Sequence, residues 1–269
     1  YVEMSSMPKD VRHLYTSDIP VPDEEEFLAN PKSEFRLPLR DRTALLRGFS
    51  TPVLFGALTW EKKLPDDSDP RTRRSYNTAV LLDDRGRVAG MSDKVFLLAF
   101  GETIPFGDTF PFLYDWIPEA SRFAAGKEPS VIRWRDRSLG MLICYEDILP
   151  RFAGDVMALE PDILMNVTND AWFGKTGEPY LHMILAAMRS VEHRRTLIRS
   201  TNTGVSVVVD PVGRVTHQTS VDDAEVIVAE VPLMTGRTLY SRVGDVFGHG
   251  CLAWAFLVLL AAGFRRRRS

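Results

Sequence analysis

GMLICYEDILP, residues 140–150, places a single cysteine at the end of an apolar run and follows it with two acids. The continuous apolar residues are typical of a strand that is buried on both faces. Residues 147–159 then predict a short helix. Cys144 is therefore expected on a tight turn between a strand and a helix, close to the partial positive charge of the helix N-terminus. That charge favours the thiolate form of a cysteine.

Further strand-like stretches recur on both sides of this turn and alternate with helical ones, which predicts an α/β domain. The strand-like stretches are TPVLFGALTW, YNTAVLLD, RVAGMSDK, SVIRW, SLGMLICY, DILMNVT, TLIRS, GVSVVVD and EVIVAEV. Residues 210–213, DPVG, mark a hairpin turn. Residues 178–194 predict a longer helix, because apolar side chains fall at helical spacing at Leu181, Ile184, Leu185, Met188 and Val191.

The C-terminal end is apolar from Val246 to Phe264 and closes with four arginines, Arg265 to Arg268. About 20 apolar residues cross a bilayer as a helix, so residues 245–264 predict a transmembrane helix rather than a buried core helix. The arginines place residues 265–269 in the cytoplasm as an Arg-rich tail, and everything before Asp245 outside it. The first residue is Tyr1 and not Met, so we expect a longer natural chain.

An extracytoplasmic compartment is oxidising, and cysteines there are usually paired. The only other cysteine, Cys251, falls in the apolar C-terminal run, which leaves Cys144 without an evident partner. A buried structural role is the commoner fate of a cysteine, but the missing partner and the position on the turn favour a reactive one. The formal net charge of -3 offers no basic face for a nucleic acid, so we expect no nucleic-acid partner.

A nucleophilic thiol needs a base to remove its proton and a donor to stabilise the oxyanion that forms at a carbonyl. The five histidines of the chain stand in no evident strand-end motif, so a carboxylate and a lysine are the better candidates. Lys94 ends a strand-like stretch, Glu102 follows in a loop bent by glycine and proline, and Glu3 ends the opening stretch. Taken singly, each of the three is more often a surface charge than a catalytic group.

Together these residues form a pattern. Glu3 in YVEMSSMP, Lys94 before FGETIPFGD, Cys144 in ICYEDILP, and then NVTNDAWFG and RSTNTGVS resemble, in order, the Glu-Lys-Cys motifs of the nitrilase (carbon-nitrogen hydrolase) superfamily. FGETIPFGD, NDAWFG, the helix from EPYLHM, and SRVGD before a terminal apolar run resemble, more narrowly, the apolipoprotein N-acyltransferase family. Phe96 and Ala99 depart from the histidine and proline that this family commonly has there, which leaves the shape of the lipid entrance open.

The resemblance implies a nitrilase-like αββα sandwich for residues 1–244, with an upstream membrane bundle and the first strand missing. It implies that Glu3 is the general base, that Lys94 stabilises the oxyanion, and that Cys144 is the nucleophile and carries an acyl thioester. Glu102 is expected to orient Lys94. Tyr145 can complete the oxyanion site through its backbone N–H, and Glu146 is a supporting acid near the turn.

Structural roles also explain the remaining polar and aromatic residues of these motifs. Trp172 and Phe173 either line the acyl pocket or belong to the core. Asn169 and Asp170 are expected to fix their loop by side-chain to backbone hydrogen bonds. His182 and His193 are predicted on the helix surface, with no metal spacing around them, so we expect no metal and no cofactor.

The function that follows is acyl transfer at the bacterial inner membrane, with the catalytic domain on the periplasmic side. A phospholipid is the expected acyl donor, and the N-terminal amine of a lipoprotein's diacylglyceryl-cysteine is the expected acceptor. Two alternatives stay open: a nitrilase-type amidase that hydrolyses a small amide with the same triad, and a membrane-anchored interaction module without activity.

Overall fold

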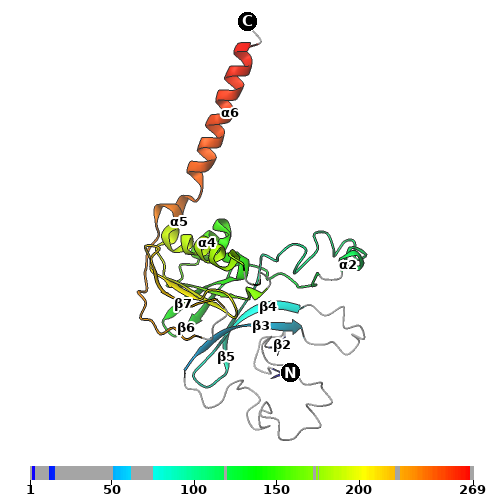
Figure 1. Cartoon of the computed structure of the whole chain (residues 1–269), viewed down its shortest axis with the longest axis vertical. Coiled ribbons are helices and arrows are strands. Elements are labelled where there is room, and N and C mark those ends of the chain that lie inside the picture. Colours follow the sequence, from blue (N-terminus) through cyan, green and yellow to red (C-terminus); the bar gives the residue numbers. More distant parts are fainter. Residues whose placement is uncertain are drawn as a thin grey trace.

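The structure is a computed structural model of the whole chain (Figure 1). It describes residues 2–3, 12–15, 51–61, 75–117, 120–171, 174, 176–221 and 225–266. Within these ranges it describes no side chains at residues 2–3, 12–15, 60–61 and 264–266.

The first half of the described chain forms a five-stranded sheet in which every strand is antiparallel to its neighbour. The spatial order follows the sequence order. The strands are β1 (Val2–Glu3), β2 (Arg12–Tyr15), β3 (Val53–Glu61), β4 (Ser75–Leu82) and β5 (Val88–Asp93). β5 ends directly before Lys94, as the sequence predicted.

A second sheet of six strands has the order β11-β10-β9-β8-β7-β6. Its strands are β6 (Val131–Trp134), β7 (Arg137–Ile143), β8 (Ile163–Thr168), β9 (Leu197–Thr201), β10 (Val207–Val209) and β11 (Val215–Gln218). The central strands β7, β8 and β9 are parallel, and the outer pairs are antiparallel. Parallel neighbours need crossover connections, and two helices supply them.

The helices are α2 (Leu113–Trp116), α3 (Pro150–Met157), α4 (Glu178–His193), α5 (Leu239–Val243) and α6 (Val246–Arg266). A short 3-10 helix, η3 (Cys144–Ile148), joins β7 to α3. α3 and α4 are the crossovers, and both lie on the outer face of the six-stranded sheet (Figure 1). The predicted nitrilase-like α/β fold is confirmed, and in the part of the chain that the structure describes its helical layer is the one that α3 and α4 form.

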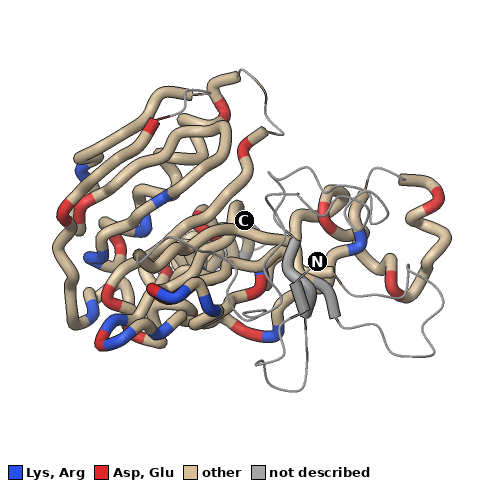
Figure 2. The backbone as a smooth tube through the Cα atoms, turned by 90° about the horizontal axis from the view of Figure 1, so that it is seen from below, with Lys and Arg blue, Asp and Glu red and all other residues tan. Residues whose placement is uncertain are grey.

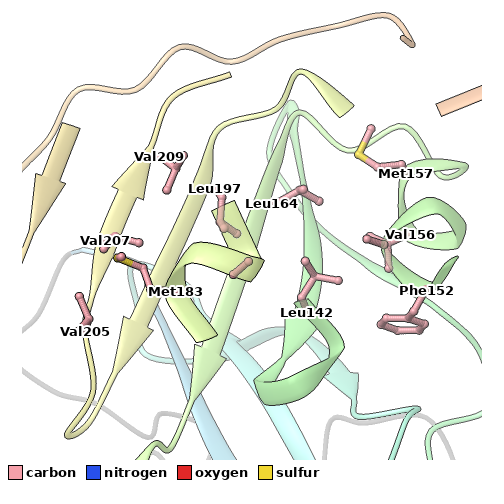
Figure 3. Close-up of a cluster of buried hydrophobic side chains, with 12 residues drawn as sticks. Leu142, Phe152, Val156, Met157, Leu164, Met183, Leu197, Val205, Val207 and Val209 are labelled. Carbon is pink, nitrogen blue, oxygen red and sulfur yellow. The ribbon is translucent and has the colours of Figure 1, made fainter. Parts of the chain in front are cut away.

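Alternate side chains of β7 enter two different cores. Met141 and Ile143 pack with Ala79 and Leu81 of β4, which fills the space between the two sheets. Leu142 points the other way and packs under α3 and α4 with residues of β8, β9 and β10 (Figure 3). β7 is therefore buried on both faces, which is why its sequence is continuously apolar.

α4 confirms the predicted helix but reverses its faces. Its exposed residues are all apolar: Tyr180, Leu181, Ile184, Leu185, Met188 and Val191. Its buried residues are Pro179, His182, Met183, Ala186, Arg189, Ser190 and His193. The prediction that His182 and His193 lie on the surface is wrong, since they are 2% and 1% exposed.

Two local predictions were wrong and one was confirmed. Residues 225–231 form no strand. The helix expected over 147–159 is split into η3 and α3, because Pro150 starts a new helix at its first position. The turn at residues 210–213 is present between β10 and β11, where Asp210 Oδ1 accepts hydrogen bonds from the N–H groups of Val212 and Arg214.

α6 projects from the α4–α5 side of the sandwich, and no other part of the described chain buries its apolar length (Figure 1). Its window Val246–Gly263 has a mean hydropathy of 1.9 and is 0% buried, so by length and composition it can cross a membrane. Over the rest of the described backbone, acidic and basic residues are interspersed and form no basic stripe (Figure 2).

Candidate active site

Cys144 occupies the turn at which β7 ends and η3 begins. Its φ of +53° lies in the left-handed region, which costs a non-glycine residue about 1 kcal/mol or more. Such strain persists only where surrounding contacts impose it, and it is common at functional sites. The sequence prediction of a sharp turn at this cysteine is confirmed.

Two side chains hold the turn through hydrogen bonds to its backbone. Asn166 of β8 donates through Nδ2 to the carbonyl oxygens of Leu142 and Cys144, at 3.0 and 3.1 Å. Glu146 accepts the N–H of Ile143 through Oε2 at 2.8 Å. The backbone before and after the thiol is therefore fixed by hydrogen bonds to buried groups.

Lys94 follows β5 and is 1% exposed. Its Nζ lies 2.6 Å from Oε2 of Glu102. That ion pair compensates the burial of the ammonium group, while no hydrogen bond of ordinary geometry engages Nζ among the described residues. Glu102 is itself fixed, because Oε1 accepts from Asn77 Nδ2 at 3.1 Å and Oε2 accepts from the Leu98 N–H at 2.8 Å. The structure thus joins Lys94 and Glu102 in the contact that the sequence predicted.

Glu146 connects the Lys94 segment to the Cys144 turn. Besides the N–H of Ile143, its carboxylate accepts the N–H groups of Val95 and Phe96, at 2.6 and 2.9 Å. Burial raises the pKa of Glu146 to about 7, although these backbone donors and Lys94 favour the ionised form. One side chain therefore sets the distance between the lysine and the cysteine.

The thiol of Cys144 is not activated in the way the sequence predicted. Burial raises its pKa above the ordinary value, and this outweighs the lowering by Lys94, by the Thr168 hydroxyl and by the Tyr145 N–H. The Tyr145 N–H at the start of η3 favours the thiolate, as expected of a helix terminus, but burial of the thiol acts in the opposite direction and is the larger effect on its pKa. A base has to take the proton as the sulfur attacks.

Three of the predicted site residues are described in part or not at all. Glu3 belongs to β1, whose register pairs it with His13 of β2, and its side chain lies outside the described residues. Trp172 and Phe173 also lie outside them. Tyr145 is described: it follows Cys144 in η3, and its ring lies 5.3 Å from the ring of His182.

The sequence missed a buried ionic cluster behind this turn. Asp147 of η3 contacts both Arg199 of β9 and His182 of α4, and Asp170 contacts the same two residues from the loop after β8. Asn169 caps its loop as expected, by accepting the N–H of Ala171 at 3.0 Å. The Asp170 carboxylate is paired to Arg199, and it accepts no backbone N–H from the part of this loop that the structure describes. An arginine in the middle of an apolar parallel strand was the available signal, because such a charge needs a buried partner.

The sequence signature of the carbon-nitrogen hydrolase family matches residues 25–240. The chain belongs to this family. The match confirms the superfamily that the Glu3, Lys94 and Cys144 motifs predicted.

Several curated relatives that match this chain are apolipoprotein N-acyltransferases. An apolipoprotein N-acyltransferase of Geobacter metallireducens is 34% identical over 83% of this chain and 42% of its own length. Those of Chlorobaculum tepidum and Bdellovibrio bacteriovorus are 31% and 41% identical, over 86% and 61% of this chain and 45% and 30% of their own lengths. The chain therefore spans less than half the length of these relatives. Among solved structures, an amidase from Nesterenkonia sp. is 25% identical with a TM-score of 0.44, over 68% of this chain and 59% of its own.

Proposed function

We propose that this chain is the catalytic part of an apolipoprotein N-acyltransferase. It moves a fatty acyl group from a phospholipid to Cys144 and then to the N-terminal amine of a diacylglyceryl-cysteine. The observation that carries the proposal is the junction made by Glu146, which ties the segment after Lys94 to the strained turn of Cys144. The names of the relatives support the choice of acyl transfer within the family.

The first half-reaction makes a thioester. The Cys144 sulfur attacks the carbonyl carbon of the phospholipid ester, while Glu3 takes the thiol proton. Lys94, oriented by Glu102, and the Tyr145 N–H stabilise the resulting oxyanion. The C–O bond then breaks, and Glu3 returns the proton to the leaving alkoxide, which departs as a lysophospholipid.

The second half-reaction uses an amine in place of water. The acceptor amine attacks the thioester carbonyl, Glu3 takes a proton from the nitrogen, and the C–S bond breaks to give an amide and the free cysteine. Because the Cys144 thiol has a raised pKa, its departure is helped by the return of that proton from Glu3.

A lipid donor fits the surroundings of Lys94 better than a small amide does. The segment that follows Lys94 exposes large apolar side chains: Phe96, Leu98, Phe100, Phe106, Phe110, Phe112 and Trp116. An exposed apolar surface of this kind is typical of a lipid or protein contact. Trp172 and Phe173 are proposed to line the acyl pocket.

We further propose that α6 anchors the catalytic domain, residues 1–244, in the inner membrane with that domain on the periplasmic side. The arginines at residues 265–268 then lie in the cytoplasm. This placement brings the active site to the lipid that it consumes.

The test is accumulation of the thioester. Full-length protein given phospholipid without acceptor should gain one acyl group on Cys144, measured by intact-protein and peptide mass spectrometry. A lipoprotein peptide with a free N-terminal amine should discharge it, and an N-acetylated peptide should not.

The matched controls are Cys144→Ser, which should load far more slowly, and Cys251→Ser, which should load normally. An adduct lost to water at the same rate with and without the peptide would identify an amidase. Absence of any adduct would contradict catalysis through Cys144.

A further inference from the structure

Four ionisable side chains are buried together behind the Cys144 turn. They come from four different parts of the fold, and each is at most 2% exposed: Asp147, Asp170, His182 and Arg199. None of them belongs to the proposed triad. Burying charges is costly unless they are paired and hydrogen-bonded, so their mutual contacts have to be close.

Arg199 and His182 each contact both aspartates. Arg199 Nη1 lies 2.9 Å from Asp147 Oδ2, and Nη2 lies 2.6 Å from Asp170 Oδ2. His182 Nε2 donates to Asp147 Oδ1 at 2.8 Å, while Nδ1 lies 3.4 Å from Asp170 Oδ1. Gly204 closes the cluster, because a Cβ there would collide with the Asp170 carboxylate.

This cluster holds the Cys144 turn at two places. Asp147 is itself a residue of η3, three positions after Cys144. Arg199 Nη1 also donates to Asn166 Oδ1 at 3.0 Å, and Asn166 donates in turn to the Cys144 carbonyl. Two contacts therefore impose the left-handed conformation of Cys144. One is the hydrogen bond from Asn166 to the Cys144 carbonyl, and the other is the pairing of Asp147 at the end of the turn.

The charge of His182 completes the balance. Two carboxylates and one guanidinium leave one negative charge, and a protonated imidazole brings the sum to zero. The hydrogen bonds to the aspartates, Asp147 first, outweigh burial and raise the pKa of His182 to about 9. Glu178 at the start of α4 and the Tyr145 ring also face the imidazole. When the proton on Nδ1 leaves, Nδ1 becomes an acceptor for the second N–H of Arg199 Nη2, 3.1 Å away, and its charged contact with Asp170 Oδ1 is lost.

We propose that His182 is a positioning residue for the thiol of Cys144: as an imidazolium it fixes Asp147 and keeps Arg199 on Asn166, and so sets the conformation of the turn. The proposal rests on Cys144 being the nucleophile. Stability alone does not explain the arrangement, since apolar residues of similar volume usually stabilise a core at least as well as a buried ion cluster. A displacement of about 1 Å at a reacting atom is enough to lower a rate by about a hundredfold.

The test compares two histidines of the same helix in full-length protein. His182→Gln keeps a donor to Asp147 and removes the charge; His193→Gln is the matched control, because His193 is equally buried but bonds to Ser241 of α5. At pH 7 the first variant should load Cys144 with acyl group about 10- to 100-fold more slowly, with the KM for phospholipid unchanged within about twofold. The control should load within about threefold of the unchanged protein.

Two further measurements separate positioning from mere folding. The ratio of loading rates, unchanged protein over His182→Gln, should fall toward one as the pH rises above about 9, where residue 182 is uncharged in both proteins. The pair Asp147→Asn with His182→Gln restores neutrality and should load at least about tenfold faster than Asp147→Asn alone.

Equal losses in both histidine variants, or a ratio that does not change with pH, would overturn the proposal. If His182→Gln does not fold, the pH dependence of the unchanged protein still tests the proposal. The rate at which the unchanged protein loads Cys144 should decline above pH 9. Failure of the unchanged protein to load at any pH would contradict the proposed function instead.

Discussion

His182 and His193 lie about three turns apart on the buried face of α4, and the two ends of that helix differ in charge. At the first end His182 meets two aspartates, and its pKa is raised to about 9. At the second end burial lowers the pKa of His193 to about 4, reinforced by Arg189, Arg195 and Arg237. The same residue type, at the same depth, thus has a raised pKa beside the Cys144 turn and a lowered pKa beside α5.

The difference shows what each end is built to hold. The imidazolium end ties α4 to η3 and β9, and so to the Cys144 turn. The neutral end ties α4 to α5, where Nδ1 of His193 lies 2.7 Å from the Ser241 hydroxyl and Thr238 donates to the Glu192 carbonyl. α5 leads directly into α6. A single helix therefore connects the proposed active site with the candidate membrane anchor.

The largest expected effect comes from removing the cation that both aspartates share. Arg199→Met leaves two buried carboxylates with only His182 between them, so the free energy of unfolding should fall by about 3–5 kcal/mol. Arg195→Met is the matched variant at the other end, because Arg195 is equally buried but donates to the carbonyls of Pro161 and Gly236. Arg195→Met should lower the free energy of unfolding by about 1–3 kcal/mol.

Chemical denaturation of the two variants in detergent measures this difference. Equal losses would mean that the charge cluster contributes no more than ordinary hydrogen bonds do. The difference in charge between the two ends of α4 would then not account for any difference in their contributions to stability.

The second prediction concerns pH and has opposite signs at the two ends. His182 has a folded pKa above its unfolded value of about 6.5, so its contribution is complete below pH 6.5 and is lost as the pH rises through about 9. His193 has a folded pKa below that value, so its contribution is complete above pH 6.5 and is lost as the pH falls through about 4. Stability should therefore decline on both sides of pH 6.5.

Two variants show which histidine causes the alkaline decline in stability and which causes the acid decline. His182→Gln should flatten the alkaline decline, and His193→Gln should flatten the acid decline, in denaturation curves measured from pH 4 to 10. Glu146 acts against the acid decline, because its raised pKa makes its contribution greatest at low pH and smaller as the pH rises from about 4.5 to 7. Both variants retain Glu146, so the difference from the unchanged protein isolates each histidine. An alkaline decline that survives in His182→Gln would assign it to another group.

The sequence could predict the elements of this site better than their contacts. β7 and the turn at Cys144 were predictable, because a continuous apolar run that stops at one polar residue has few other structures. α6 was predictable from its length alone. The helical spacing of the apolar residues on the exposed face of α4 was visible in the sequence. Such a spacing shows that the residues share one face of the helix, but not whether that face is buried or exposed. The buried face, with His182, Arg189 and His193, has the same period.

No local signal identified the partners in the contacts that join distant segments; Arg199 in an apolar strand indicates only that some buried partner exists. Glu146 reaches the amides of Val95 and Phe96, and Asp147 reaches Arg199, only because β5, β7 and β9 end at the same edge of the sandwich. The raised pKa of Cys144 likewise depends on how deeply the turn is covered, which no motif records. Motif recognition thus gave the residues of the proposed triad, and only the tertiary structure shows which groups hold Lys94 and the Cys144 turn.

The smallest expected effect concerns the outer face of α4, which sharpens the contrast with its buried face. Ile184 is 56% exposed, whereas the adjacent Met183 is 7% exposed and packs in the core under α4. Ile184→Ser should change the free energy of unfolding by less than about 0.5 kcal/mol, and Met183→Ala should lower it by about 2–5 kcal/mol. Denaturation of the two variants, side by side, measures both values. A loss of more than about 1 kcal/mol in Ile184→Ser would contradict the assignment of faces. It would mean that the apolar stripe is covered in the protein in solution, and the loss should then depend on protein or detergent concentration.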